Sequence, residues 1–186
     1  MNVVLLSGSP SAPSRSNALL EHLQARFEKL GLPWQLLRLR ELPAQALLQA
    51  QVDDPQLQDA IAQVQRADLV IVATPIYKAA YSGLLKVFLD LLPPDGLRGK
   101  AVLPLATGGS IAHLLAVEYA LKPVLHALGA RHITDAVFAV DAQLPRAADG
   151  DGYTPEPAVI ERLDRALAGL LATPRSQAFI ASLMRA

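Results

Sequence analysis

Directly after its first apolar run the chain reads Gly8-Ser9-Pro10-Ser11-Ala12-Pro13-Ser14-Arg15-Ser16-Asn17, and a helical pattern follows. A strand that ends in such a loop and opens a helix directs several unpaired backbone N–H groups at one place. The positive end of the helix macrodipole lies there too, so a phosphate is the group expected to bind. Serine hydroxyls, one guanidinium and one side-chain amide surround the place. The loop therefore predicts a phosphate site.

Two better-known phosphate loops are excluded by the sequence. No Gly-Lys-Ser/Thr follows the loop, as a Walker A motif requires, and the Gly-x-Gly-x-x-Gly fingerprint is absent. An ordinary Ser/Pro-rich turn with a capping Ser or Asn is the alternative interpretation. The position directly after the first strand favours the phosphate site.

Short apolar runs alternate with longer helix-periodic segments along the chain. We expect strands at residues 3–6, 34–39, 68–74, 101–105 and 133–140, the third closed by Pro75. We expect helices at residues 16–30, 55–65, 82–91, 111–128 and 157–171, and a short extra helix within 42–51. This alternation predicts an α/β fold, a flavodoxin-like five-stranded parallel sheet in the order 2-1-3-4-5 with helices on both faces. In such a sheet, ligands bind beyond the carboxyl ends of the strands.

The composition narrows the class of protein. The 186 residues suit a single domain, which we expect to span 1–175, with a C-terminal tail at 176–186. Seventeen basic residues balance seventeen acidic ones, so no nucleic-acid partner is expected. The absence of Cys and the spacing of His22, His126 and His132 indicate no metal site. No apolar stretch approaches the roughly 20 residues of a membrane span and no signal peptide is indicated, so we expect a cytoplasmic protein without a membrane partner.

If this fold is right, the loops after the first, third and fourth strands should form one site. The loop at 74–83 offers a proline turn, aromatic and aliphatic surface and backbone amides, and the loop at 106–113 offers two glycines that allow close backbone approach. A planar heterocycle with a phosphate tail would use all three loops. Taken alone, Tyr77 and Tyr81 could be rim aromatics, and Gly108-Gly109 a plain turn.

Four stretches of the chain carry a family resemblance. They are Gly8-Ser9-Pro10 with Ser14-Arg15-Ser16, the run VATPIYKAAYSG at 72–83, the run LPLATGG at 103–109, and HLLAV at 113–117 with YALKPVL at 119–125. They resemble the NAD(P)H-dependent FMN reductases of flavodoxin-like fold, above all the reductase component of two-component alkanesulfonate or methanesulfonate monooxygenase systems. Beyond Val140 the resemblance fades, and the role of that region stays open.

The resemblance implies a set of flavin-binding residues. Ser9, Arg15, Ser16 and Asn17 would hold the FMN phosphate, Pro75, Ile76, Tyr77 and Lys78 would line the isoalloxazine, and Thr107, Gly108, Gly109 and Ser110 would hold its pyrimidine edge. Hydride transfer from NADPH or NADH to FMN needs no catalytic side chain, because the cofactors carry the chemistry. His113, at the start of a helix, is more often structural than a ligand contact.

The resemblance also implies partners. Members of the family supply reduced FMN to a flavin-dependent monooxygenase that desulfonates organosulfonates, and they form homo-oligomers, either dimers or tetramers. Two other functions stay open for this chain. One is a quinone or azo reductase that retains its FMN, and the other is a flavodoxin-type electron-transfer module. The colour of the purified protein and direct oxidation of NAD(P)H would separate the three.

Pro123 interrupts the apolar period of the fourth helix. It has no N–H for the carbonyl of Tyr119, four residues back, so a kink, a water or a π-bulge must relieve the mismatch. The resemblance implies a π-helix at this tyrosine, located at a subunit interface. We therefore expect Tyr119 to control flavin residence and oligomer packing.

Overall fold

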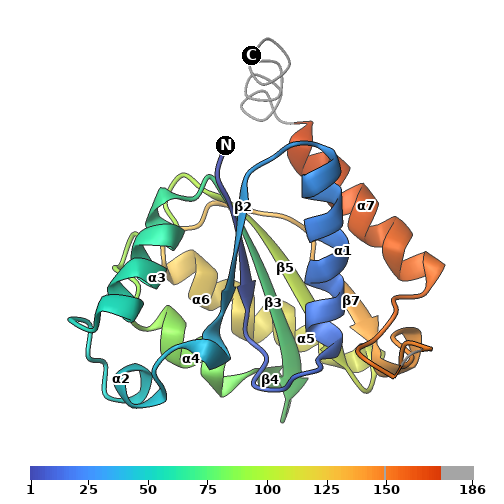
Figure 1. Cartoon of the computed structure of the whole chain (residues 1–186), viewed down its shortest axis with the longest axis horizontal. Coiled ribbons are helices and arrows are strands. Elements are labelled where there is room, and N and C mark those ends of the chain that lie inside the picture. Colours follow the sequence, from blue (N-terminus) through green and yellow to red (C-terminus); the bar gives the residue numbers. More distant parts are fainter. Residues whose placement is uncertain (149, 173–186) are drawn as a thin grey trace.

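The computed structural model describes residues 1–148 and 150–172, which form a central sheet between two layers of helices (Figure 1). The strands are β1 (Val3–Ser7), β2 (Trp34–Arg38), β3 (Leu69–Tyr77), β4 (Ala80–Tyr81), β5 (Ala101–Gly108), β6 (His132–Ile133) and β7 (Val137–Val140). The α-helices are α1 (Arg15–Lys29), α2 (Ala44–Leu48), α3 (Pro55–Arg66), α4 (Gly83–Leu89), α5 (Leu114–Ala116), α6 (Lys122–Ala127) and α7 (Pro157–Leu171). Three short 3-10 turns, η1 (Leu39–Glu41), η2 (Ile111–His113) and η4 (Asp141–Gln143), and a π-helix, η3 (Val117–Leu121), complete them. The expected boundary at 175 and the tail at 176–186 lie outside the described residues.

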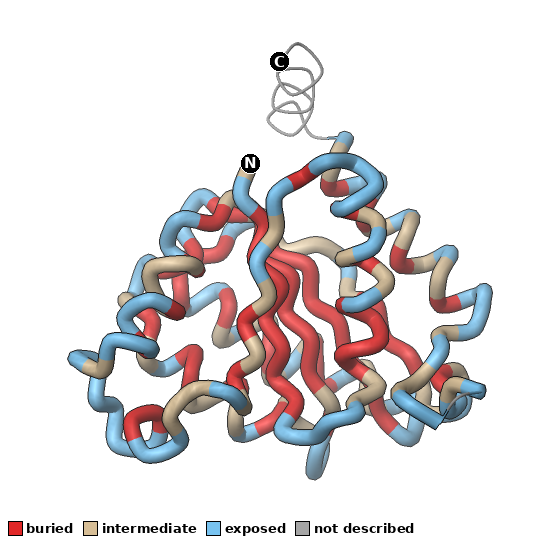
Figure 2. The backbone as a smooth tube through the Cα atoms, viewed as in Figure 1, coloured by how far each residue is buried: buried red, intermediate tan, exposed pale blue. Residues whose placement is uncertain are grey.

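The predicted sheet order is confirmed. The strands run β2-β1-β3-β5-β6, and each of these pairs is parallel. Because side chains alternate along each strand, the sheet contributes to two cores. Leu5 and Ile71 pack with α1 and α7 on one face, whereas Val4 and Val72 pack with α3, α4 and α6 on the other. Figure 2 shows the buried strands enclosed between these helices.

The expected strand at 133–140 is divided in two. β6 pairs with Ala101 and Val102 of β5, and β7 begins to pair only at Leu105. The gap falls at Pro104, which has no N–H to donate. The carbonyl of Val102 accepts from the N–H of Thr134, so the backbone groups of Val102 face the edge strand. The backbone groups of every second residue of a strand face the same neighbour, so the position where Pro104 lacks an N–H also faces the edge strand, at the gap. The proline explains why the edge strand breaks there.

The third strand is longer than predicted. Pro75 does not close it: the strand pairs with β5 as far as Pro75 and continues to Tyr77. Proline favours an extended residue before it, so it keeps the strand direction here. The chain then turns back into β4, an unpredicted antiparallel partner of β3. Lys78 and Ala79 form the two-residue turn with φ of 50° and 63°.

The expected helix at 111–128 is not continuous. It consists of the 3-10 turn η2, one turn of α5, the π-helix η3 and then α6. A π turn pairs a carbonyl with the N–H five residues on, and here the N–H of Lys122 donates to the carbonyl of Val117. Pro123 then falls in the first turn of α6, where an N–H has no intrahelical acceptor. Of the three ways expected to relieve the proline mismatch, the π-bulge is the one adopted.

Candidate functional site

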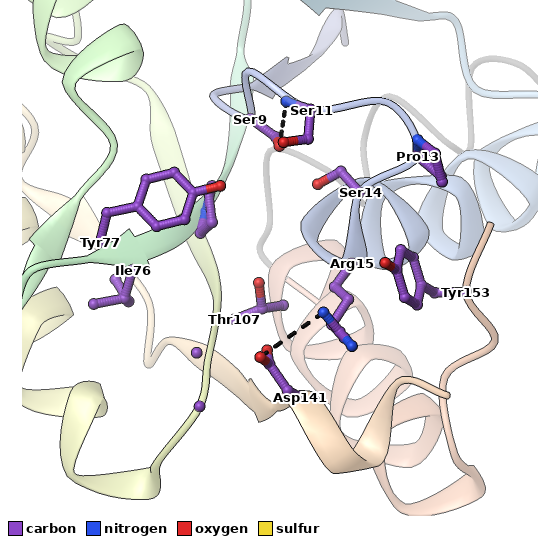
Figure 3. A pocket seen from close by; sticks show the side chains of 13 residues that line it. Ser9, Ser11, Pro13, Ser14, Arg15, Ile76, Tyr77, Thr107, Asp141 and Tyr153 are labelled. Atoms are coloured by element: carbon purple, nitrogen blue, oxygen red, sulfur yellow. Dashed lines mark hydrogen bonds and ion pairs between the residues drawn. The ribbon is translucent and has the colours of Figure 1, made fainter. Parts of the chain in front are cut away.

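The three predicted loops meet in one pocket at the carboxyl ends of β1, β3 and β5 (Figure 3). The residues that line it are Ser9, Ser11, Pro13, Ser14, Arg15, Pro75, Ile76, Tyr77, Thr107, Gly108, Gly109, Asp141 and Tyr153. Eight of these are among the twelve residues that the sequence assigned to cofactor binding. The pocket therefore lies at the edge of the sheet that the fold prediction indicated.

Gly8 joins the first loop to the second. Its N–H donates to the carbonyl of Ala73 at 2.8 Å, and its own carbonyl accepts from the hydroxyl of Ser82, which also caps α4. A Cβ at position 8 would lie 2.9 Å from Cβ of Leu85, closer than packed carbon atoms approach. Only glycine fits here, and its bonds fix the two loops relative to each other.

Hydroxyl groups surround the start of α1. The N-cap residue Ser14 does not cap the helix with its side chain, and its Oγ lies 3.0 Å from Oγ of Ser16. Oγ of Ser9 accepts from the N–H of Ser11 at 3.2 Å. The first N–H groups of a helix have no intrahelical acceptor, so this end of the pocket is rich in donors. It suits an anion.

Arg15 supplies the cation at this end of the pocket. Its Nη1 lies 3.8 Å from Oδ2 of Asp141, and its guanidinium carbon lies 4.5 Å from the ring centre of Tyr153. Its Nε is buried without a hydrogen-bond partner among the described residues. A buried donor without an acceptor is costly, so an acceptor oxygen supplied by a ligand at this end of the pocket would stabilise the site. Arg146 also lies over the Tyr153 ring, at 4.9 Å.

The other end of the pocket is built mainly from backbone. Residues 75–77 form one wall, and Thr107, Gly108 and Gly109 form the other. A Cβ at Gly108 would lie 3.0 Å from Nδ1 of His113 and 3.3 Å from Cζ of Phe138. The glycine thus lets the chain lie against the His113 ring. This arrangement gives His113 a supporting role behind the loop.

Four of the predicted binding residues do not line this pocket. Asn17 turns toward the sheet, where its Oδ1 accepts from the hydroxyl of Ser7 at 2.6 Å, and Ser16 is fully buried. Lys78 is exposed in the turn of the β3–β4 hairpin. Ser110 accepts from the N–H of Ala112 at 3.3 Å and caps η2. The side chains of Ser16, Asn17 and Ser110 are buried or bonded within the protein, whereas that of Lys78 is exposed in the hairpin turn.

Five lining residues were not assigned from the sequence: Ser11, Pro13, Ser14, Asp141 and Tyr153. Asp141 directly follows β7, which pairs with β5. Its place at the end of the expected strand 133–140 was the sequence feature that could have identified it as a lining residue. Tyr153 comes from the region whose role was open, and its backbone pairs with Arg146 in an isolated bridge. Nothing in the sequence pattern places it here.

Hydrogen bonds to α7 hold α1, the helix that begins with Arg15, in position. Asp164 accepts hydrogen bonds from Nε of Arg26 at 2.9 Å and from Nε2 of His22 at 2.8 Å. The hydrogen bond from Arg26 is the largest cause that lowers the pKa of Asp164 below its usual value. The carboxylate thus stays charged and holds the helix that carries Arg15.

The donor set fits a phosphorylated planar molecule. Hydroxyls, helix N–H groups and the unpartnered Nε of Arg15 converge at one end. At the other end, Gly108 and Gly109 allow a flat ring to approach the backbone. In the described parts of the chain no three His, Asp or Glu side chains are grouped as metal ligands, and no helix is long and apolar enough to cross a bilayer.

Comparison with known proteins agrees with this chemistry. An FMN reductase (NADPH) of Escherichia coli K12 is 50% identical over 167 residues, which are 90% of this chain and 86% of that protein. An NADH-dependent FMN reductase, SfnF, of Pseudomonas putida is 35% identical and covers 90% of this chain and 89% of its own. The crystal structure of the apo form of an NADH:FMN oxidoreductase, EMOB, superposes with a TM-score of 0.77 at 38% identity, covering 94% of this chain and 92% of that one.

Residues 1–144 match the sequence profile of the family described as NADPH-dependent FMN reductase. The match covers the sheet as far as β7 and includes the loops after β1, β3 and β5. The chain therefore belongs to the NADPH-dependent FMN reductase family, flavodoxin-like oxidoreductases that use NAD(P)H to reduce FMN.

Proposed function

We propose that the pocket binds FMN with its phosphate at Ser9, Ser11, Ser14 and Arg15 and its isoalloxazine along residues 75–77 and 107–109. One observation carries the proposal: three loops, distant in sequence, converge with a cation at one end and glycine backbone at the other. The buried Nε of Arg15, which has no hydrogen-bond partner in the described residues, supports placing the phosphate rather than the ring at this end.

FMN, when bound, supplies the chemistry, because its ring accepts a hydride from a nicotinamide. The task of the chain is placement. Arg15 and the first turn of α1 hold the anionic tail, and Ile76 and Tyr77 cover one side of the ring. Backbone N–H groups of the 107–109 loop favour the negative charge that develops on the pyrimidine edge of the ring. No side chain of the pocket needs to act as a general acid or base.

We further propose that the reduced flavin leaves the protein and serves a flavin-dependent monooxygenase, which desulfonates organosulfonates in the cytoplasm. The carboxylate of Asp141 supports release, because it stands beside Arg15 in the wall that would face the phosphate. A like charge there opposes tight retention of a dianion. The link to sulfonates is supported by the resemblance of residues 113–125 to the sulfonate-linked reductases.

An exposed apolar face supports assembly into a homo-oligomer, a dimer or a tetramer. Ile111, Leu115 and Tyr119 follow one another at intervals of four residues and are 65%, 57% and 80% exposed. The hairpin strand β4 packs against the π-helix that carries Tyr119. Exposed apolar residues gathered in this way are typical of protein interfaces. We assign this face to a contact between subunits, close to the ring end of the pocket.

Oxidation of NADPH and NADH with and without added FMN tests the function. We expect a colourless purified protein whose oxidation of the reduced nucleotide depends on added FMN. A yellow protein that oxidises NAD(P)H with a quinone or azo dye, without added flavin, would instead identify a flavin-retaining reductase. If the protein oxidises neither NADPH nor NADH, the result would favour the alternative function, a flavodoxin-type electron-transfer module.

Deletion of Tyr119 tests the role of the π-helix. Removing one residue should restore a regular helical repeat and rotate the apolar face, since a π-bulge contains one extra residue. We expect a changed elution volume in size-exclusion chromatography or flavin that stays bound through purification. The substitution Tyr119→Phe keeps the bulge and serves as control. A deletion variant that elutes and loses flavin like the parent would exclude this role.

A further inference from the structure

The ring of Tyr153 lies between the flavin pocket and a second hollow. The second hollow has a volume of about 470 Å³, and Tyr153 lines both spaces together with Pro13 and Ser14. The ring is half-buried and packs against the core that α1 and α7 share with the sheet. The family match ends at residue 144, so Tyr153 lies outside it. The reduction of FMN, as proposed above, gives this side chain no task.

A backbone pairing between residues 145–146 and 153–154 holds Tyr153 in this place. The N–H of Thr154 donates to the carbonyl of Pro145 at 3.0 Å, and Tyr153 pairs with Arg146 in an antiparallel bridge. Leu144, directly before this pairing, is fully buried in the same core. Tyr153 is therefore attached to the body of the protein through its backbone, and its ring is presented to the start of α1.

The ring contacts the guanidinium group that the proposed phosphate would bind. The guanidinium carbon of Arg15 lies 4.5 Å from the ring centre (Figure 3). A cation within about 6 Å of an aromatic face is attracted to it. The ion pair of Arg15 with Asp141, at 3.8 Å, is longer than a hydrogen bond, so it restrains the direction of the guanidinium only weakly. The flat ring of Tyr153 therefore restrains a long side chain that has many other rotamers.

The ring also shields this cation from water. Arg15 lines the flavin pocket but not the second hollow, whereas Tyr153 lines both. Attraction between opposite charges is stronger where less water screens them. Without the ring, water in the second hollow would reach the guanidinium and weaken its attraction for a phosphate.

We propose that Tyr153 is a positioning residue for flavin binding: its ring holds and shields Arg15, and so sets how tightly the phosphate of FMN is bound. The inference rests on the proposed placement of that phosphate at Arg15. The contact uses the face of the ring, so the phenol hydroxyl is not required. The effect is confined to flavins that have a phosphate, because the ring acts through Arg15.

Fluorescence titration of the wild-type protein, Tyr153→Ala and Tyr153→Phe with FMN and with riboflavin tests this role. We expect Tyr153→Ala to raise the Kd for FMN about three- to tenfold, as loss of a partly shielded cation–π contact predicts, and the Kd for riboflavin to change less than about twofold. Tyr153→Phe should restore the wild-type affinity for FMN. Trp34→Ala removes another half-buried aromatic from the same core, away from the pocket, and is the matched control.

A double-mutant cycle shows whether Tyr153 acts through Arg15. In an Arg15→Ala background, Tyr153→Ala should change the Kd for FMN less than about twofold, because no guanidinium is left for the ring to hold. An effect of equal size in both backgrounds would mean that Tyr153 acts on the flavin independently of Arg15, and the positioning role would be wrong.

The outcomes separate this role from the proposed function. Wild-type protein that binds FMN no better than riboflavin would contradict the phosphate placement and with it the role of Tyr153. If FMN binds better than riboflavin but Tyr153→Ala weakens both flavins equally, or neither, only the positioning role is excluded. A Tyr153→Phe variant as weak as Tyr153→Ala would assign the contact to the hydroxyl. Tighter binding of FMN by Tyr153→Ala would show that the ring competes with the phosphate for Arg15; either result overturns the proposal.

Discussion

At the proposed phosphate end of the pocket, hydroxyls and a guanidinium project from Ser9, Ser14 and Arg15, whereas residues 75–77 and 107–109, with two glycines among them, line the proposed ring end. The phosphate end also contains an opposing carboxylate, Asp141, and the ring end contains no charged lining residue among those described. Side chains can therefore be exchanged at one end to change affinity. At the other end, the shape of the backbone decides binding.

If FMN lies as proposed, binding of the ring would depend on the shape of the β3 and β5 strand ends, which the sheet fixes. Binding of the phosphate would depend on Arg15, a cation shared between an acid and an aromatic ring, Asp141 and Tyr153. Replacing a single side chain at the phosphate end should thus shift flavin affinity in either direction without disturbing the fold.

Arg15→Ala should cause the largest change in the affinity for FMN relative to the affinity for riboflavin. Loss of a charge-assisted contact of roughly 1.5–3 kcal/mol should weaken FMN binding about 10–100-fold. Riboflavin, which has no phosphate, should bind to the variant and the parent alike. Fluorescence titration with both flavins measures this difference. Arg146→Ala is the control, because Arg146 touches the same tyrosine ring from outside the pocket. An unchanged Kd for FMN would rule out the phosphate assignment.

Gly108→Ala tests the ring end. The new Cβ would lie 3.0 Å from Nδ1 of His113, so the loop must shift by a few tenths of an ångström. We expect a cost of about 1–2 kcal/mol and so roughly tenfold weaker binding of FMN and riboflavin alike. The matched control is Gly169→Ala in α7, outside the pocket lining, since a Cβ there meets nothing within 4 Å. Weaker binding of FMN alone would contradict the division between the two ends.

Asp141→Asn should act in the opposite direction. Removing the carboxylate frees Arg15 and removes a repulsion of the phosphate, so FMN should bind about 3–5-fold more tightly at low salt. Riboflavin affinity should stay the same, and added salt should reduce the gain. Titrations at two ionic strengths measure both effects. Weaker FMN binding would mean that the acid positions Arg15 instead of competing with the ligand.

Most of the ring end was predictable from the sequence because its signals are local, although Lys78 and Ser110, also expected there, do not line the pocket. Gly108-Gly109 and the run around Pro75 directly follow apolar strands, and parallel strands bring such loops to one edge. The order of the central strands followed from the same alternation. The hairpin β3–β4 was missed because Lys78 and Ala79 are not residues that favour its left-handed turn.

The phosphate end was predictable only in part. Ser9, Arg15, Ser16 and Asn17 were expected to hold the phosphate; Ser9 and Arg15 line the pocket, whereas Ser16 is buried and Asn17 bonds to Ser7 beside it. The difference depends on where α1 begins, since starting the helix at Arg15 turns the next two residues toward the sheet. Tyr153 lies 138 residues beyond Arg15 in the sequence and reaches it through a loop that has no periodic pattern.

Ala79→Gly should have the smallest effect and only on stability. Ala79 has a φ of 63°, where an L-residue costs about 1–2 kcal/mol and glycine does not. Glycine loses more conformational freedom on folding, by roughly 0.5–1 kcal/mol, so the net gain in unfolding free energy should stay below about 1.5 kcal/mol. Thermal unfolding should then show a Tm higher by about 6 °C at most.

The control for this hairpin variant is Ala80→Gly, in the paired strand β4, which should lower the Tm. Flavin binding should not change in Ala79→Gly, because residues 75–77 belong to β3 and Pro75 is held by its pairing with β5. If Ala79→Gly weakens FMN and riboflavin together, the turn itself shapes the ring end. The boundary of that end would then extend from the sheet edge into the hairpin.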